Sequence, residues 1–86
     1  MIKIDNDSVY EVVVEDCIDG DRTTRTELFR TFEDAQEYMN NKIEIFEIES
    51  PNLPLQDKGE NFVSYYKDGW YNDNHYDITI FEKEIN

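Results

Sequence analysis

The chain has 86 residues, of which 21 are acidic and eight are basic, and its formal net charge at pH 7 is −13. A charge of this sign argues against binding to bare nucleic acid or to an anionic membrane. It favours a basic protein surface or divalent cations as partners. The length predicts a single domain, residues 1–86. Aromatic residues make up 14% of the chain, which predicts a folded protein rather than a disordered one.

Cys17 is the single cysteine, so no disulfide can form within the chain. This is typical of a reducing environment. The first residues lack the apolar segment of a signal peptide, and no apolar run approaches the roughly 20 residues of a membrane span. We expect a soluble, cytoplasmic protein.

Residues 9–18 contain a β-branched centre, and their period of two places Tyr10, Val12 and Val14 on one apolar face, which predicts a strand. Asp19 and Gly20 then form a strong hairpin signal, and residues 23–29 form the return strand.

The register of this hairpin depends on its loop. A two-residue turn would pair Val12 with Glu27, whereas a three-residue loop would pair Val12 with Leu28. The second register keeps the apolar face consistent, so we expect it. The arginines of this region are expected to pair with acidic neighbours across the hairpin; they are Arg22, Arg25 and Arg30.

A helix start follows at Thr31, whose side chain can accept a hydrogen bond from the backbone N–H of Asp34. Glu33 and Asp34 in the first turn complement the helix dipole, and Glu33 and Glu37 face outward. The apolar stripe consists of Ala35, Tyr38, Met39 and, if the helix continues that far, Ile43.

We expect this helix to end at Asn40 and Asn41. Residues 43–49 fit two patterns, because helical spacing continues through Ile43 and Phe46 while isoleucines among glutamates favour a strand. A third strand is the preferred interpretation, and the helix stays open.

Two prolines predict a loop over residues 50–58. A second helix is expected over residues 60–68, capped by Asp57 and ended by Gly69. The alternative is a strand over residues 62–66. After a polar turn at residues 71–75, the last strand covers residues 76–85, with one apolar face formed by Tyr76, Ile78 and Ile80.

This order of elements predicts the α+β class. We expect a small antiparallel sheet, formed by the N-terminal β-hairpin and the C-terminal strand, with one or two helices packed on one face.

No motif for catalysis, cofactor binding or metal binding is present in the sequence. Fragments around Asp5, Asp16 and Asp19 do not complete a calcium-loop pattern and are better explained as turns. One cysteine and one histidine far apart in the sequence, Cys17 and His75, argue against zinc. These two residues could meet as a nucleophile and a base, but Cys17 is expected at a hairpin end and His75 in a polar turn, which does not support catalysis. The sequence therefore predicts a protein that is not an enzyme.

The acidic residues suggest a binding function. Carboxylates two residues apart on a strand lie about 6.6 Å apart on one face, and Glu47 with Glu49 has this spacing. Such a row is roughly commensurate with the phosphates of a nucleic-acid strand. One hypothesis is a DNA mimic that binds the basic, nucleic-acid-binding groove of a nucleic-acid enzyme. The alternative is an acidic surface that only increases solubility.

The residues predicted to form the phosphate-like face are Glu44, Glu47, Glu49, Asp68, Asp73 and Asp77, with Trp70 and Tyr71 as aromatic anchors. Exposed tyrosine and tryptophan suit a protein–protein contact, because they combine rigid area with a polar tip. A different class of function is therefore a structural or adaptor domain that forms a homodimer through its aromatic face or an open sheet edge.

The segment Phe-Val-Ser-Tyr-Tyr-Lys-Asp-Gly-Trp at residues 62–70, the Ile-Thr-Ile at residues 78–80 and the acidic end at residues 82–86 resemble the end of a small acidic phage-encoded anti-CRISPR protein. The resemblance covers about a quarter of the chain. It implies an inhibitor that occupies the PAM-reading site of a type II effector nuclease as a DNA mimic. The hairpin, the helix after Thr31 and the last strand also resemble small uncharacterised proteins of phages and mobile elements.

Overall fold

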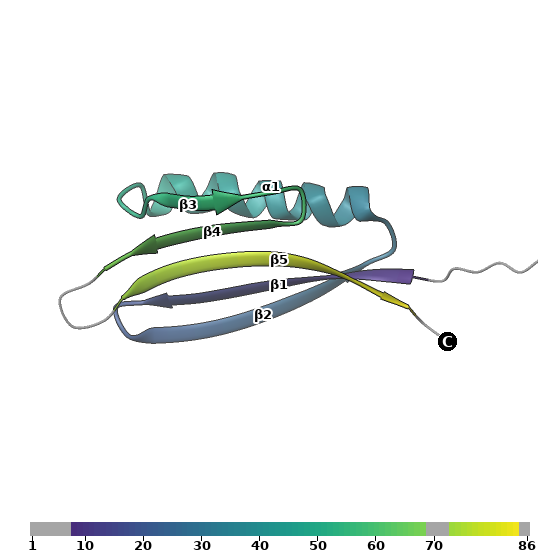
Figure 1. Cartoon of the computed structure of the whole chain (residues 1–86), viewed down its shortest axis with the longest axis horizontal. Helices are drawn as coiled ribbons and strands as arrows, with labels where there is room; N and C mark the ends of the chain where they lie inside the picture. Colours follow the sequence, from purple (N-terminus) through teal and green to yellow (C-terminus); the bar gives the residue numbers. More distant parts are fainter. Residues whose placement is uncertain (1–7, 69–72, 85–86) are drawn as a thin grey trace, which may run out of the picture.

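The computed structural model describes residues 8–68 and 73–84. Within these residues it contains β1 (Ser8–Ile18), β2 (Asp21–Phe29), α1 (Phe32–Glu49), β3 (Leu55–Lys58), β4 (Phe62–Lys67) and β5 (Asn74–Glu84). The strands form a five-stranded sheet in the order β2-β1-β5-β4-β3 (Figure 1), and all neighbours are antiparallel. The α+β class is confirmed. The sheet is larger than the expected hairpin plus one strand, and α1 is the one helix in the described residues.

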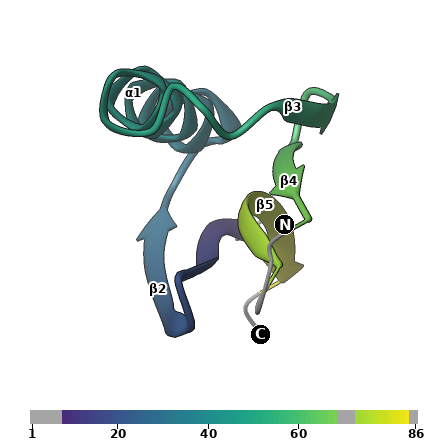
Figure 2. The same cartoon turned by 90° about the vertical axis from the view of Figure 1, so that its left-hand side faces the viewer.

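The sheet is strongly curved and α1 lies on its concave side (Figure 2). The opposite, convex side carries no helix among the described residues. Residues directly opposite each other on antiparallel strands share a face. The two faces of the sheet therefore present different sets of side chains, one toward α1 and one away from it.

The β1–β2 hairpin has a two-residue turn. Asp19 and Gly20 have φ angles of 54° and 87°, as a type I′ turn requires, and the twist of this turn matches that of the strands it joins. Val12 consequently lies opposite Glu27, so the three-residue loop with Leu28 opposite Val12 was wrong. The apolar face did not decide the register, because β2 is an edge strand and Leu28 is 63% exposed.

Helix α1 begins as predicted. The backbone N–H of Asp34 donates to Thr31 Oγ1 at 3.1 Å, which satisfies one of the free N–H groups of the first turn. The helix does not end at Asn40 and Asn41, however, but continues to Glu49.

The prediction of a strand over residues 43–49 was wrong. Ile43 and Phe46 are buried and extend the stripe that begins with Ala35 and Met39, whereas Ile48 is 79% exposed. Helical spacing places Ile43 and Phe46 against the sheet. The free energy gained by burying them outweighs the β preference of the isoleucines.

The second predicted helix was also wrong, and its alternative is correct: β4 covers Phe62–Lys67. Val63 and Tyr65 are buried while their neighbours are only partly so, which is the period of two of a strand. The predicted loop over residues 50–58 contains β3. Asp57 lies within β3 and does not cap a helix, and Gly69 lies outside the described residues.

The last strand was predicted with the correct apolar face, because Tyr76, Ile78 and Ile80 are buried. It begins earlier than expected, at Asn74, so His75 belongs to β5 and not to a turn. The described ion pairs join Lys83 to Glu11 and His75 to Asp77. In the described part of the chain none involves an arginine, contrary to the expected pairing across the hairpin.

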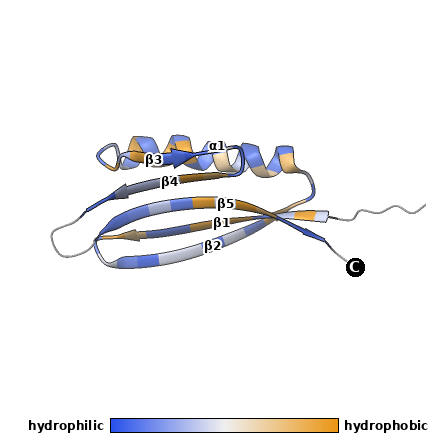
Figure 3. Ribbon diagram, in the orientation of Figure 1, coloured by the Kyte–Doolittle hydropathy of each residue, from blue (hydrophilic) through white to orange (hydrophobic). Residues whose placement is uncertain are grey.

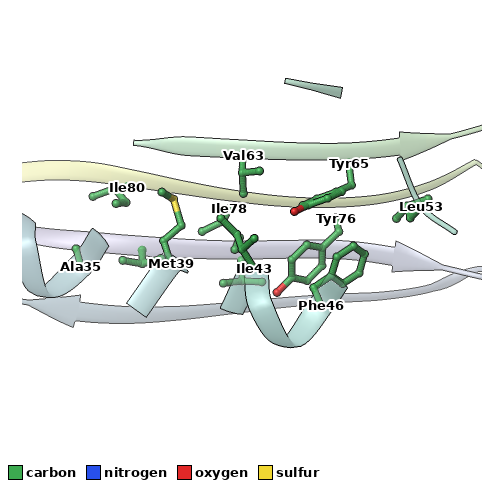
Figure 4. Close-up of a cluster of buried hydrophobic side chains, with 12 residues drawn as sticks. Ala35, Met39, Ile43, Phe46, Leu53, Val63, Tyr65, Tyr76, Ile78 and Ile80 are labelled. Atoms are coloured by element: carbon green, nitrogen blue, oxygen red, sulfur yellow. The ribbon is translucent and has the colours of Figure 1, made fainter. Parts of the chain in front are cut away.

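The core lies between α1 and the concave side of the sheet (Figure 4). The ring of Phe46 stacks on that of Tyr76, with centroids 3.9 Å apart and planes 4° apart, and Tyr65 packs on Phe46 at 4.9 Å. Figure 3 shows apolar segments on α1 and the central strands, whereas β2 and β3 are mainly hydrophilic. Over the described residues, no helical segment combines the length and apolarity that crossing a membrane requires.

Replacement of Phe46 tests this packing. We expect Phe46→Ala to lower the free energy of unfolding by about 3–5 kcal/mol, because it removes a buried ring and leaves a cavity. Ile48→Ala is the matched control on the same helix and should change it by less than about 0.5 kcal/mol. Urea denaturation followed by circular dichroism measures both. Equal losses would contradict the assignment of Ile48 to the exposed side.

Candidate partner-binding surface

Acidic side chains are concentrated on α1. The helix carries six carboxylates and one basic side chain, Lys42, so its net charge is −6 + 1 = −5. Lys42 Nζ lies 5.3 Å from the centre of the Tyr38 ring, on which it packs. The carboxylates belong to Glu33, Asp34, Glu37, Glu44, Glu47 and Glu49.

Three of these residues form a row along the exposed side of the helix. Glu33, Glu37 and Glu44 are all exposed, and at 3.6 residues per turn they lie within about 40° of each other around the helix axis. Along the axis, Glu37 lies about 6 Å from Glu33 and about 10.5 Å from Glu44. We call these three residues the helix carboxylate row. It points away from the core.

Only one member of the row, Glu44, was among the predicted site residues. Glu33 and Glu37 were predicted to face outward but were not included in the site. Alignment of Glu44 with them requires a helix that continues past Asn41, whereas the sequence predicted an end at Asn40 and Asn41.

Glu47 and Glu49 do not form the pair that a strand would create, because residues two apart on a helix point about 200° apart. Glu47 Oε2 accepts a hydrogen bond from the Tyr65 hydroxyl at 2.8 Å and so turns toward β4. Glu49 instead lines an open groove together with Asp16. Neither side chain shares the direction of Glu44.

Asp77 lies on the convex side of the sheet, away from α1. Its carboxylate accepts a hydrogen bond from the Ser64 hydroxyl at 2.6 Å and lies 2.8 Å from His75 Nδ1. It therefore cannot share one flat docking surface with the helix carboxylate row.

Asp68 and Asp73 are brought together by a tyrosine. The Tyr66 hydroxyl donates to Asp68 Oδ1 at 2.8 Å. The pKa of Tyr66 is raised well above its usual value, first by this hydrogen bond and then by one with Asp73. The two predicted aromatic anchors, Trp70 and Tyr71, lie outside the described residues.

The sheet register also places Cys17 directly opposite His75, a proximity that the sequence analysis did not expect. The His75 ring lies against Asp77, so a thiol, an imidazole and a carboxylate are neighbours on the convex side. Cys17 is only 8% exposed, however. The convex side thus offers solvent the polar groups of His75 and Asp77 and very little of the sulfur.

Two open grooves flank the C-terminal end of α1, with volumes of about 240 and 300 Å³. They lie at or below the lower limit of typical small-molecule pockets, about 300–1,000 Å³. Over the described residues, no group of three or more histidine, cysteine, aspartate or glutamate side chains is arranged to hold a metal ion.

Comparisons with family models, with curated proteins and with solved structures return no match to this chain. The candidate surface is therefore defined by its charge and geometry.

The buried tyrosines give a pH test of this arrangement. Burial, followed by the hydrogen bond to Glu47, raises the pKa of Tyr65 far above its usual value, and burial raises that of Tyr76 to about 12. Both hydroxyls ionise near pH 10 in an unfolded chain. Their contribution to stability is therefore complete below pH 10 and is lost as the pH rises toward 12.

We expect the urea midpoint to fall between about pH 10 and pH 12, together with a rise in tyrosinate absorbance. The double variant Tyr65→Phe, Tyr76→Phe should lose less stability over this range, because neither ring can then ionise. If the urea midpoints of the two proteins fell equally with pH, the loss of stability could not come from ionisation of the buried hydroxyls.

Proposed function

We propose that this chain is a non-enzymatic protein that binds a basic, nucleic-acid-binding surface of another protein by presenting carboxylates in place of phosphates. The observation that carries the proposal is the concentration of charge on α1, where six acidic side chains accompany one lysine. The resemblance of the C-terminal segment extends the proposal to an inhibitor from a phage or mobile element. Its partner is then a nuclease of host defence in the host cytoplasm.

The spacing of the helix carboxylate row supports mimicry. Each strand of B-DNA advances about 3.4 Å along its axis per phosphate. The backbone also winds around the DNA axis, so each phosphate step is longer than this rise, and the intervals of about 6 Å and 10.5 Å between the row's residues correspond to about one to two phosphate steps. A guanidinium group that binds a phosphate can bind a carboxylate with the same two-pronged geometry. Arginines placed along a DNA-binding groove can thus bind carboxylates of the row in place of phosphates.

The row is also available for such contacts. Within the described residues, Glu33, Glu37 and Glu44 are exposed and take part in no hydrogen bond or ion pair. Glu47 and Asp77, by contrast, hold Tyr65 and Ser64 in place. A partner that contacts the row would therefore replace water and not an internal hydrogen bond.

Charge-matched variants separate a specific surface from general acidity. The test variant is Glu33→Gln, Glu37→Gln, Glu44→Gln. The control is Glu15→Gln, Asp21→Asn, Glu84→Gln, which removes three charges from β1, β2 and β5. The readout is displacement of fluorescent duplex DNA from purified defence nucleases, including a guide-loaded type II effector, by the wild-type protein and both variants.

We expect the test variant to displace DNA at least about tenfold more weakly than the wild type, because charge-assisted contacts are lost. The control should stay within about threefold of the wild type. Equal weakening of both variants would show that only total charge matters. If the wild-type protein displaced DNA from none of the nucleases tested, the inhibitory role would be contradicted.

The salt dependence of the same displacement is a separate prediction. Affinity of the wild-type protein should fall steadily as salt is raised from about 50 to about 500 mM, because exposed charge pairs are screened. The test variant should show a smaller slope than the control. An affinity that does not respond to salt would contradict an electrostatic docking mode.

A further inference from the structure

The two edges of the sheet differ in how they are protected against pairing with another strand. Edge strand β3 has four residues, follows Pro54 and shifts register between Leu55 and Asp57. Short length, proline and bulges are the usual means of preventing edge-to-edge association. The opposite edge, β2, runs for nine residues, contains no proline and pairs with β1 without a register shift. It is a regular template for another strand.

The free backbone groups of β2 can be assigned from its turn. A two-residue turn makes Ile18 and Asp21 a hydrogen-bonded pair, and such pairs then alternate along the ladder. The odd-numbered residues of β2 therefore bond to β1. The outward-pointing N–H and C=O groups belong to Arg22, Thr24, Thr26 and Leu28. In the described residues no other strand occupies this edge.

We propose that β2 pairs antiparallel with β2 of a second copy of this chain, centred on Thr26, to give a continuous ten-stranded sheet. The charges on β2 select this register. With Thr26 opposite itself, Arg25 of each copy lies opposite Glu27 of the other, so that two complementary pairs form. A pairing centred on Arg25 or on Glu27 would place that residue opposite the same residue of the other copy, so like charges would meet. A pairing centred on Thr24 would place Asp21 of each copy opposite Glu27 of the other.

The overall charge distribution also favours this edge. Residues 22–30 contain three arginines and one glutamate, and so carry +2 in a chain of −13. Two copies that meet through this segment approach each other where their mutual repulsion is lowest. In Figure 1, β2 runs along the lower margin of the molecule and α1 lies at the opposite margin. Pairing through β2 therefore leaves the helix carboxylate row exposed.

A second copy fits this edge better than an unrelated acidic strand. An acidic peptide would complement Arg25 but would face Glu27 with a like charge, whereas β2 carries the matching alternation itself. The pairing would form about six main-chain hydrogen bonds across the seam. An interface of this size predicts a weak dimer whose population depends on concentration. The pairing is independent of the proposed function.

Sedimentation equilibrium of the full chain tests the proposal. We expect the average mass to rise from one toward two chain masses as the concentration increases from about 10 µM to about 1 mM. Glu27→Arg should weaken the dimer at least about tenfold, because Arg25 then faces an arginine. The exchanged double variant Arg25→Glu, Glu27→Arg should restore it to within about threefold.

A backbone variant tests the hydrogen bonds themselves. Thr26→Pro removes an N–H that points outward, which an edge strand tolerates, and it should abolish the dimer. Thr26→Val keeps the N–H and should retain the dimer. Circular dichroism verifies that each variant is folded.

Three results would overturn the proposal: a monomer throughout the concentration range, a dimer unaffected by Glu27→Arg, or an exchanged double variant that stays monomeric. A wild-type chain that remains monomeric but binds a glutamate-rich peptide through β2 would overturn it in favour of an acidic partner strand.

Discussion

The stacking of Phe46 on Tyr76 is the contact on which the rest of the structure depends. Helix α1 has no basic residue in its last turn, where Glu47 and Glu49 instead face the negative end of the helix dipole. Short helices are marginal in isolation even with favourable charges. The C-terminal half of α1 therefore exists because Ile43 and Phe46 are buried against the sheet. That burial holds the acidic side of the helix outward.

The same constraint separates the carboxylates into two groups. Three of the predicted site carboxylates are engaged within the fold: Glu47 holds Tyr65, Asp68 holds Tyr66, and Asp77 holds Ser64. Those on the outer side of α1 form the helix carboxylate row and interact with solvent. A docking partner would therefore meet charges whose use does not weaken the fold. This division makes the row, and not acidity in general, the surface on which the proposed function depends.

The sequence predicted the elements whose local signals and burial agree, namely the Thr31 cap, the first turns of α1 and the apolar faces of β1 and β5. It failed where one pattern fitted two structures. Phe62, Val63 and Tyr66 satisfy helical spacing, yet Val63 and Tyr65 pack at strand spacing once β5 lies beside them. The helix carboxylate row was not predicted as a unit for a related reason. The outward direction of Glu33 and Glu37 was visible, but the alignment of Glu44 depends on tertiary packing, as does the proximity of Cys17 to His75.

The surface proposed for binding exists only if α1 continues unbroken to Glu49 and so aligns Glu44 with Glu33 and Glu37. Backbone chemical shifts from nuclear magnetic resonance over residues 40–49 test this continuity. We expect helical shifts without interruption to Glu49, with slow amide exchange at Ile43 and Phe46. Strand-like shifts from Ile43 onward would contradict it, because the row would then end at Glu37.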